Sequence, residues 1–454
     1  MLNKFDVSEI AIKGKAELYG ESLEVNGFSI DTRTLLNGDL YIALKGKNFN
    51  GNDFISEAIN KGAKAIVADH YFESKVPLLV VDNAETFLQN LAIMNRLAFE
   101  SPVIGITGSN GKTSSKEIVA ALLSSKMSCH KTIGNKNNQI GLPFSLADLD
   151  SSYDCSILEL GTSFQGEIGL LSSIAKPDIA LITNVSESHL SGLGSVELIA
   201  KEKGDIGCFE NDKGVIVLNK DSEYFDFWSN TTNANKVISF GTKEGCDLQV
   251  HSTDIDFNNN QTNFVLTHQD EEFKCIMNGV GLHNSLNAAG ALAVCSGLGL
   301  ALDEIIDNLQ RIELPQRRLS LYRMSNGSLL IDDSYNANPE SVKQSIDTMC
   351  VSGMNKKIMV LGEMGELGND AAKHHKEISV YAKTRVDNFL CLGDSWQEGV
   401  KLFGEKGIVF SSREELVDHV SSILETDTVI LVKGSRSVSY THLRAHETRH
   451  DLVC

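Results

Sequence analysis

The segment "GITGSNGKTSSKE", residues 105–117, combines residue types and a spacing that suit phosphate binding. It ends in Gly111-Lys112-Thr113, as a P-loop does, but the strict pattern GxxxxGK[ST] needs a glycine where this chain has Ile106. In a shorter GxxGKT loop, backbone N–H groups can still surround a phosphate, while Lys112 adds a positive charge and Thr113 offers a hydroxyl to Mg²⁺. The residues expected to contact the phosphates are Gly108, Ser109, Asn110, Gly111, Lys112, Thr113 and Ser114.

The sequence on both sides of this loop predicts elements that would hold it in place. "VIGIT" before it is typical of a buried strand, and a helix is expected from about 113 to 127. That helix would place Ile118, Val119, Leu122 and Leu123 on one face. A glycine turn followed by a surface lysine is the simpler alternative. The loop alone therefore indicates only that the protein binds a phosphoryl group.

Along the chain, apolar strands alternate with helices, which predicts an α/β protein. We expect three domains: a substrate-binding domain at 1–98, a central P-loop-type ATPase domain with a mostly parallel sheet at 99–312, and a Rossmann-like domain at 313–454. Within the second, residues 247–277 alternate polar and apolar side chains, as in an antiparallel meander. The last residues, 439–454, are rich in His and Arg; we interpret them as a non-native tail rather than a metal- or anion-binding segment.

Composition excludes several classes of protein. The net charge of -19 argues against binding to nucleic acid or to an acidic membrane surface. The nine cysteines form no CxxC pair, so neither a zinc site nor a disulfide framework is predicted. No apolar segment is long enough for a signal core or a membrane span. These observations predict a cytoplasmic protein, which we expect to be a monomer.

A series of further motifs indicates to which kind of phosphate-binding protein the loop belongs. The motifs are "TGSNGKT", "TIGNKNNQIGLP" (132–143), "LELGTSFQGEI" (158–168), "NVSESHLSGLGS" (184–195), "IAKEKGDI" (199–206), "LNKDS" (218–222), "GLHNSLNAAGALA" (281–293), "IDDSYNANPESV" (331–342), "LGEMGELG" (361–368) and "VKGSRS" (432–437). In this order they resemble the Mur ligase superfamily, ATP-dependent amide-forming enzymes of peptidoglycan synthesis and folate polyglutamylation. "DDSYNANP" with "LGEMGELG" resembles the branch that adds D-alanyl-D-alanine to UDP-MurNAc-tripeptide.

The resemblance implies an ADP-forming ligase of cell-wall synthesis. ATP would convert the terminal carboxylate of the peptide into an acyl phosphate, and the amine of D-alanyl-D-alanine would displace phosphate. The protein would act mainly by positioning its substrates and neutralising their charge, with two Mg²⁺ ions. Lys112 would hold the β- and γ-phosphates and Thr113 the first ion.

The resemblance also implies the other metal ligands. Glu159 follows the strand "CSILE", at the strand end where open α/β sheets bind ligands, although a solvated acid is the plain alternative. His189 would bind the second ion, whereas a lone histidine is usually structural. Lys203 would be carbamylated, which turns a cation into a carboxylate-like ligand. Its distance from "GDI" favours it over Lys201.

The remaining assignments concern the substrates. Asn284 resembles an adenine-contacting asparagine, but it could equally cap a core helix. Arg318 resembles an arginine near the domain junction, although the family usually has Gly-Arg where this chain has Arg317-Arg318. Asp333 would reach the nucleotide from the third domain. The substrate-binding candidates are Ser29, Asp31, Thr32 and Arg33 for the uridine diphosphate, Asn135, Asn137 and Asn138 for the sugar or peptide, and Tyr335, Asn336 and Asn338 for the dipeptide.

Two other classes of function remain open from the sequence. One is another ligase of the superfamily, either the enzyme that adds the third amino acid or folylpolyglutamate synthase. The other is a P-loop NTPase that acts as a switch or a transport motor. An inactive nucleotide-binding scaffold is disfavoured by Lys112, Glu159, His189 and Lys203 together. The sequence does not identify the third residue of the stem peptide.

Overall fold

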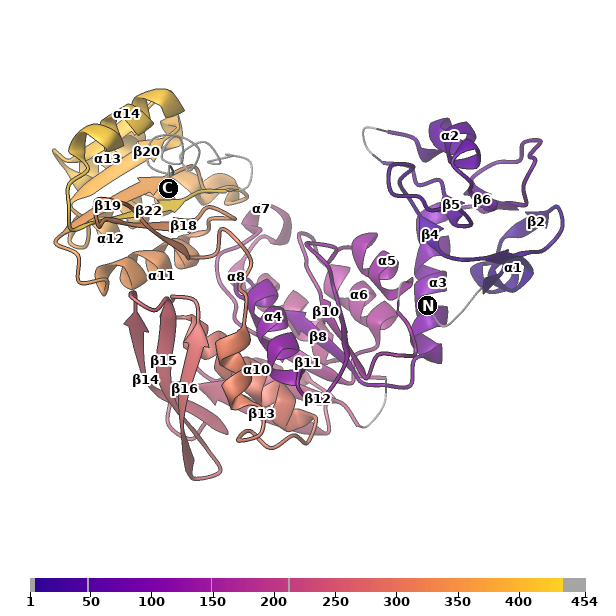
Figure 1. Ribbon diagram of the computed structural model, residues 1–454, viewed down its shortest axis with the longest axis horizontal. Helices are drawn as coiled ribbons and strands as arrows, with labels where there is room; N and C mark the ends of the chain where they lie inside the picture. The colour runs from indigo at the N-terminus through magenta and orange to yellow at the C-terminus, as the bar shows by residue number, and fades with distance from the viewer. Residues whose placement is uncertain (1–4, 47–48, 148, 211–212, 436–454) are drawn as a thin grey trace.

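The computed structural model describes residues 5–46, 49–147, 149–210 and 213–435, so the predicted tail at 439–454 lies outside the described residues. Three α/β units follow one another along the chain, and the first and third lie at opposite ends of the second (Figure 1). Their sheets have five, nine and six strands. The predicted three-domain α/β fold is confirmed, while the boundaries at 98/99 and 312/313 stay predictions.

The first unit is a small sheet with helices on both faces. Leu40 and Ile42 pack towards α1 and α3, whereas Tyr41 between them packs towards α2, as strand alternation requires. In order across the sheet, the strands are β2 (Glu17–Tyr19), β7 (Leu78–Val80), β6 (Ala65–Ala68), β5 (Leu40–Ile42) and β4 (Phe28–Ser29), and β1 (Phe5–Asp6) pairs with β3 (Glu24–Val25). The helices are α1 (Val7–Gly14), η1 (Gly51–Phe54), α2 (Ile55–Asn60) and α3 (Ala84–Ala98).

The central unit has one mixed sheet of nine strands. Strands β8 to β14 are paired in parallel, and β14, β15 and β16 form the predicted antiparallel meander. In order across the sheet, the strands are β16 (Glu271–Asn278), β15 (Gln261–His268), β14 (Leu248–Asp256), β13 (Lys236–Gly241), β12 (Val215–Asn219), β11 (Ile179–Ile182), β8 (Val103–Thr107), β10 (Cys155–Glu159) and β9 (Cys129–Lys131).

Helices cover both faces of the parallel part of this sheet. Ile104 and Ile106 face α4 and α10, and Val103 belongs to the core on the opposite face, so all of β8 is buried. The helices are α4 (Lys112–Leu123), α5 (Gly141–Ala147), α6 (Glu167–Ala175), α7 (Leu190–Leu193), α8 (Val196–Gly204), η2 (Asp205–Gly207), α9 (Phe225–Thr231), α10 (Asn284–Gly297) and η3 (Ile306–Arg311). Because β8, β10 and β11 are parallel, the residues that follow them meet at one edge of the sheet.

Helix α4 is shorter than the sequence predicted. It ends at Leu123 instead of about 127. The hydroxyl of Ser124 donates a hydrogen bond to the carbonyl of Ala121 at 2.7 Å. Side-chain bonds of this kind compete with the helical ladder, and Ser124 and Ser125 add no apolar residue to the buried face. The predicted buried stripe itself is correct, since Ile118, Val119, Leu122 and Leu123 are fully buried.

The third unit is a six-stranded sheet in which only β17 is antiparallel. Helices α11, α12 and α13 cover one face and α14 the other. In order across the sheet, the strands are β17 (Ser320–Arg323), β18 (Leu329–Asp333), β22 (Thr428–Lys433), β19 (Lys356–Leu361), β20 (Asn388–Leu392) and β21 (Gly407–Phe410). The helices are α11 (Pro339–Cys350), η4 (Gly368–Asp370), α12 (Ala371–Lys383), η5 (Asp394–Trp396), α13 (Gln397–Phe403) and α14 (Arg413–Ile423).

Strand β22, the last of the described chain, lies between β18 and β19. This order pairs Lys433 with Asp333 at the carboxyl ends of their strands. Across the described ranges, no helix is both long enough and apolar enough to cross a lipid bilayer.

Candidate active site

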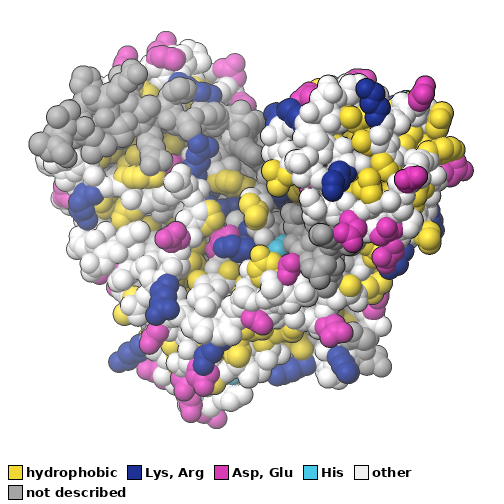
Figure 2. Space-filling model, turned by 45° about the vertical axis from the view of Figure 1, so that its right-hand side comes forward, with side chains coloured by type: hydrophobic (Ala, Val, Ile, Leu, Met, Phe, Trp, Pro, Cys, Tyr) yellow, Lys and Arg dark blue, Asp and Glu magenta, His cyan; other side chains and the backbone are white. Residues whose placement is uncertain are grey.

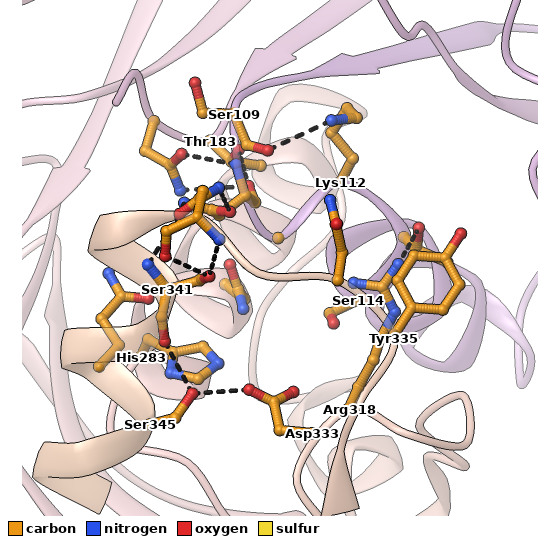
Figure 3. Close-up of a pocket in the computed structure, with 18 of the residues that line it drawn as sticks. Ser109, Lys112, Ser114, Thr183, His283, Arg318, Asp333, Tyr335, Ser341 and Ser345 are labelled. Atoms are coloured by element: carbon orange, nitrogen blue, oxygen red, sulfur yellow. Dashed lines mark hydrogen bonds between the residues drawn. The ribbon is translucent and has the colours of Figure 1, made fainter. Parts of the chain in front are cut away.

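A cavity of about 710 Å³ lies where the central and third units face each other. The face drawn in Figure 2 is hollowed between two lobes, with Lys or Arg and His side chains at the bottom of the hollow. The predicted residues that line the cavity are Ser109, Asn110, Gly111, Lys112, Thr113, Ser114, Asn135, Asn137, Glu159, His189, Asn284, Arg318, Asp333, Tyr335, Asn336 and Asn338. Figure 3 shows ten of the lining residues by name, from both sides of this space.

The phosphate-type loop connects β8 to α4, as the sequence predicted. Gly111 has φ 81°, and a Cβ there would lie 2.4 Å from Oδ1 of Asn287, so glycine is required. Residues of the segment between β11 and α7 hold the loop. Asn184 accepts from the backbone N–H of Asn110 at 2.9 Å, and Ser188 donates to the hydroxyl of Ser109 at 2.9 Å. The loop is therefore fixed with its backbone at the cavity wall.

Lys112 is folded back onto its own loop. Its ammonium donates to the carbonyl of Gly108 at 2.7 Å. Burial lowers the pKa of Lys112; the Glu159 carboxylate opposes this shift and the Arg318 guanidinium adds to it. Gly108 itself does not line the cavity. Lys112 is thus a cation at the loop, and its ammonium bonds to backbone carbonyls. A phosphate could take the place of these carbonyls.

Thr113 and Glu159 form the polar centre of the cavity. The hydroxyl of Thr113 donates to Oε2 of Glu159 at 2.9 Å, and Asn137 donates to Oε1 at 2.8 Å. Magnesium prefers oxygen ligands. A hydroxyl beside a carboxylate is a donor set of this kind, so the chemistry of Thr113 and Glu159 is compatible with the predicted magnesium site.

His189 and Lys203 are placed differently from each other. His189 lines the cavity in a left-handed conformation (φ 54°), and its Nδ1 lies 2.5 Å from Oε2 of Glu366 in the third unit. Lys203 is only 1% exposed and does not line the cavity. Burial lowers the pKa of Lys203 well below its ordinary value, and the positive charge of Lys112 lowers it further. The predicted ligand set is thus partly assembled, with Lys203 behind the cavity wall.

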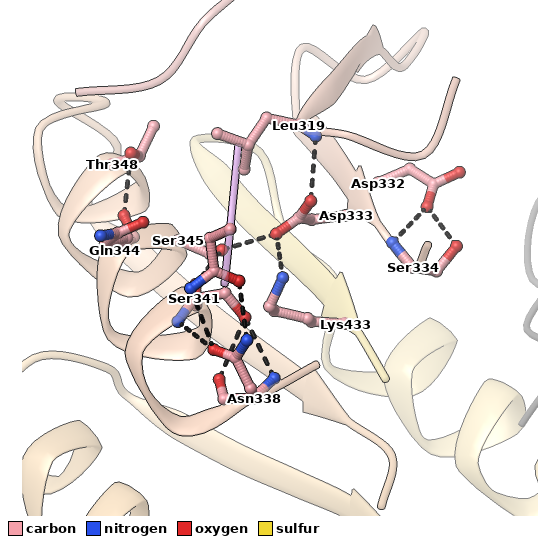
Figure 4. A network of polar contacts seen from close by, with 11 residues as sticks. Leu319, Asp332, Asp333, Ser334, Asn338, Ser341, Gln344, Ser345, Thr348 and Lys433 are labelled. Atoms are coloured by element: carbon pink, nitrogen blue, oxygen red, sulfur yellow. Dashed lines mark hydrogen bonds and ion pairs between the residues drawn. The ribbon is translucent and has the colours of Figure 1, made fainter. Parts of the chain in front are cut away.

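Asp333 lies in a buried polar network at the end of β18 (Figure 4). It contacts the ammonium of Lys433 and accepts from the hydroxyl of Ser345 at 2.6 Å. The neighbouring imidazole of His283 is buried, and this burial lowers the pKa of His283 to about 4. Nδ1 of His283 has no hydrogen-bond partner among the described residues. The cavity thus offers a fixed carboxylate beside an uncharged imidazole whose Nδ1 has no partner among the described residues.

Arg318 joins the two walls of the cavity. It lies between Arg317 (φ 64°) and Leu319 (φ 53°), two non-glycine residues in the left-handed region, and it lines the cavity. The guanidinium stacks 4.1 Å from the ring centre of Tyr335 and donates to the hydroxyl of Thr113 at 3.0 Å. Its Nε is buried without a hydrogen-bond partner among the described residues, so one donor remains for an anionic ligand.

Asn284 is the first residue of α10 and Asn338 is the N-cap of α11, both beside the cavity. Asn284 donates to the carbonyl of Val280 at 3.0 Å and makes no side-chain cap of α10. Asn338 caps α11, and its amide also donates to Oδ1 of Asn110 at 2.7 Å. A side chain of the third unit is therefore bonded to the phosphate-type loop of the second.

Other predicted residues are not brought to this cavity. Asn138 accepts from the backbone N–H of Gly141 at 2.8 Å, at the start of α5. The substrate candidates of the first unit form a separate group, in which Arg33 pairs with Asp31 at 2.5 Å. The members of that group are Ser29, Asp31, Thr32 and Arg33, and none of them lines the cavity.

Sequence reasoning missed several residues of the cavity. Thr183, Asn184 and Asn219 lie at or just after the ends of β11 and β12, a position that marks ligand-binding edges. Glu366 and Lys433 belong to the motifs "LGEMGELG" and "VKGSRS", and Asn184 and Asn219 belong to "NVSESHLSGLGS" and "LNKDS", but the motifs predict no role for these four residues. Strand-end polar residues in a parallel sheet were the signal that could have identified the first three.

Comparisons with known proteins agree with this architecture. The sequence matches three family descriptions: "Mur ligase family, catalytic domain" over residues 24–97, "Mur ligase middle domain" over 106–295, and "Mur ligase, glutamate ligase domain" over 317–436. Curated proteins named UDP-N-acetylmuramoyl-tripeptide–D-alanyl-D-alanine ligase are similar to it. The protein from Escherichia coli is 32% identical over 93% of this chain and 94% of its own length. That from Bacillus subtilis is 33% identical over 92% of each.

Solved structures are similar over nearly the whole chain. A crystal structure of MurF from Acinetobacter baumannii is 25% identical, covers 99% of both chains and has a TM-score of 0.92. A crystal structure of the MurF ligase from Thermotoga maritima in complex with ADP is 28% identical, covers 94% of this chain and 97% of its own, and has a TM-score of 0.84.

Proposed function

The chain belongs to the Mur ligase family, and we propose that it joins D-alanyl-D-alanine to UDP-MurNAc-tripeptide with ATP, in peptidoglycan precursor synthesis. The observation that carries this proposal is one cavity in which a phosphate-type loop, the Thr113–Glu159 pair and Arg318 of the third unit converge. Curated relatives that share this activity in their name match more than nine tenths of the chain.

The residues of the chain would act by positioning and by charge. ATP transfers its γ-phosphoryl group to the peptide carboxylate, which gives an acyl phosphate and ADP. The dipeptide amine then attacks the carbonyl carbon, phosphate leaves, and the amine gives up a proton. Lys112 would turn from the carbonyl of Gly108 to the β- and γ-phosphates, and Arg318 would use its free Nε on the same anions.

We propose two magnesium ions, with Thr113 and Glu159 at the first and His189 and a carbamylated Lys203 at the second. When bound, the ions neutralise the phosphate charge that accumulates during transfer. The hydroxyl of Thr113 beside the carboxylate of Glu159 at the cavity wall supports the first assignment. The low pKa of buried Lys203 supports the second, because only an uncharged amine adds carbon dioxide, releasing one proton as the carbamate forms.

The substrate-binding roles remain proposals of the same kind. Ser29, Asp31, Thr32 and Arg33 would meet the uridine diphosphate in the first unit, with Arg33 leaving Asp31 to pair with phosphate. Tyr335, Asn336 and Asn338 line the cavity and would contact the dipeptide. Asp333 and Asn284 would contact the nucleotide. We place the protein in the cytoplasm, where ATP is available, and as a monomer, because one chain supplies both walls of the cavity.

The test is phosphate release by the purified full chain with ATP and Mg²⁺. Release should require UDP-MurNAc-tripeptide and D-alanyl-D-alanine together, and single amino acids should not replace the dipeptide. Lys112→Ala should lower the rate by about 10²-fold or more while the protein stays folded. Release without any acceptor amine would favour an NTPase switch. Activity with a single amino acid or with a folate would favour another ligase of the family.

A further inference from the structure

A second group of potential metal ligands lies away from the cavity, on the seam between the central and third units. Glu187 belongs to the segment between β11 and α7. His374 and Glu377 lie one turn apart on α12. One ligand atom from each of the three lies within 4.8 Å of the other two. None of these residues lines the cavity of the candidate active site.

The histidine provides an independent indication of a ligand. His374 is 2% exposed, yet its Nδ1 has no hydrogen-bond partner among the described residues. Carboxylate oxygens of Glu187 and Glu377 lie 3.3 Å and 3.4 Å from this nitrogen, close enough for hydrogen bonds but without their geometry. A buried imidazole nitrogen without a partner is costly, so a group placed between these three atoms would stabilise it.

The distances fit a tetrahedral metal. Zinc binds imidazole nitrogen and carboxylate oxygen at about 2.0–2.2 Å, which separates tetrahedral ligands by about 3.3–3.5 Å. Both separations from Nδ1 fall in this range, and one oxygen of Glu187 lies within 4.8 Å of one oxygen of Glu377. The side chains of Glu187 and Glu377 are 37% and 42% exposed, so one side of the group is open to a water as fourth ligand.

We propose that Glu187, His374 and Glu377 bind one divalent transition-metal cation of the zinc type, which joins the central unit to the third. Two carboxylates and a neutral imidazole balance the charge of the cation. An imidazole ligand favours such a metal over magnesium, which prefers oxygen ligands. The nearby Lys373 lies 3.9 Å from the other oxygen, Oε1, of Glu377 and leaves Oε2 available.

The expected consequence is a clamp close to the candidate active site. Glu187 precedes His189 by two residues, and His189 itself contacts Glu366 of the third unit. Two His–Glu contacts therefore cross the seam. In one the histidine is His189 of the central unit, and in the other it is His374 of the third unit. A metal bound at Glu187, His374 and Glu377 would tie both segments together and stabilise the folded chain by mass action.

The test is zinc binding to the full chain, measured by calorimetry and by the visible spectrum of Co²⁺ as a replacement metal. Millimolar Mg²⁺ is present throughout to occupy oxygen-ligand sites. Wild type should bind one zinc ion. His374→Ala and Glu187→Gln should each bind zinc at least about tenfold more weakly than wild type does. Co²⁺ should give intense tetrahedral bands in wild type that both variants lack. His251→Ala, which removes an exposed histidine on the central meander, is the matched control.

Zinc should also raise the unfolding temperature of wild type and of His251→Ala, but not of the two ligand variants. Glu187→Gln keeps the size of a half-exposed side chain, so it remains informative if His374→Ala fails to fold. Equal zinc stoichiometry and affinity in wild type and Glu187→Gln would overturn the proposal. That result would mean that His374 contacts the two carboxylates directly, without a metal ion between them. Ligase activity with Mg²⁺ is measured separately. A chain without ligase activity could still bind zinc at these three residues, so the two proposals are tested independently.

Discussion

At the scale of single residues, Lys203 is the most informative side chain of the molecule. Lysine is rarely buried without a partner, because transfer of an ammonium out of water is costly. Here the side chain is 1% exposed, and its pKa is lowered by burial and by the charge of Lys112. An uncharged amine in this position is a better nucleophile for carbon dioxide than a surface lysine. Burial and the proposed carbamate are therefore physically connected.

The prediction for Lys203 separates a carbamate from a plain cation. Lys203→Ala removes the carbamate, so turnover should collapse, and acetate should partly restore it by ligating the metal in the vacated space. Lys203→Arg should also be inactive, without rescue, because a guanidinium stays charged and forms no carbamate. Phosphate release with and without acetate measures both effects. Substantial activity in Lys203→Arg, or rescue of the alanine variant by amines instead of acetate, would contradict the carbamate.

At the scale of helices and strands, the sequence correctly predicted the features that depend on residues close together in the chain. The strand "VIGIT", the glycine loop and the buried stripe of α4 were correct, because alternation, glycine geometry and helical period act over a few residues. The end of α4 was predicted too late. That boundary depends on Ser124, whose hydroxyl bonds to a helix carbonyl. The predicted phosphate contacts line the cavity, apart from Gly108, because strand, loop and helix are consecutive in the chain.

Residues that meet through sheet order were harder to predict. Lys433 contacts Asp333 only because β22 inserts beside β18, a pairing between positions 100 residues apart. Glu366 meets His189 only because the third unit lies against α7. No periodic pattern encodes either contact. The sequence identified Asp333 and His189 through motifs, whereas their partners required the three-dimensional arrangement.

The prediction at this scale concerns two helix caps. Asn338 caps α11 and Ser412 caps α14, each by accepting from a backbone N–H three residues later. Asn338→Ala and Ser412→Ala should each lower the free energy of unfolding by about 1 kcal/mol, measured by urea denaturation. Only Asn338→Ala should also slow ATP-dependent phosphate release, because it removes the bond to Asn110 of the loop. Equal turnover in the two variants would reduce Asn338 to a structural cap.

At the scale of the whole molecule, the cavity depends on how two units face each other. Arg318 donates to Thr113, Asn338 to Asn110, and His189 contacts Glu366, each across the same seam. The chain carries a net charge of -19, yet Lys112, Arg318 and Lys433 line this cavity. These basic residues thus provide positive charge where an anionic substrate has to bind, against the negative charge of the whole chain. They come together at one site only while the two units face each other.

The last prediction tests whether these units must separate during turnover. In α7, Ser191 approaches Gly368 of the third unit so closely that a Cβ on Gly368 would lie 3.8 Å from that of Ser191. Disulfides join Cβ atoms about 3.5–4.5 Å apart, so Ser191→Cys with Gly368→Cys should cross-link on oxidation. The left-handed φ of 62° at Gly368 adds strain of about 1–3 kcal/mol.

Mass spectrometry should show the cross-link, and turnover should fall severalfold and recover with dithiothreitol, because ligands enter between walls from both units. Ser191→Cys alone should respond to neither treatment. Full turnover by the cross-linked protein would mean that substrates enter and products leave without any movement at this seam.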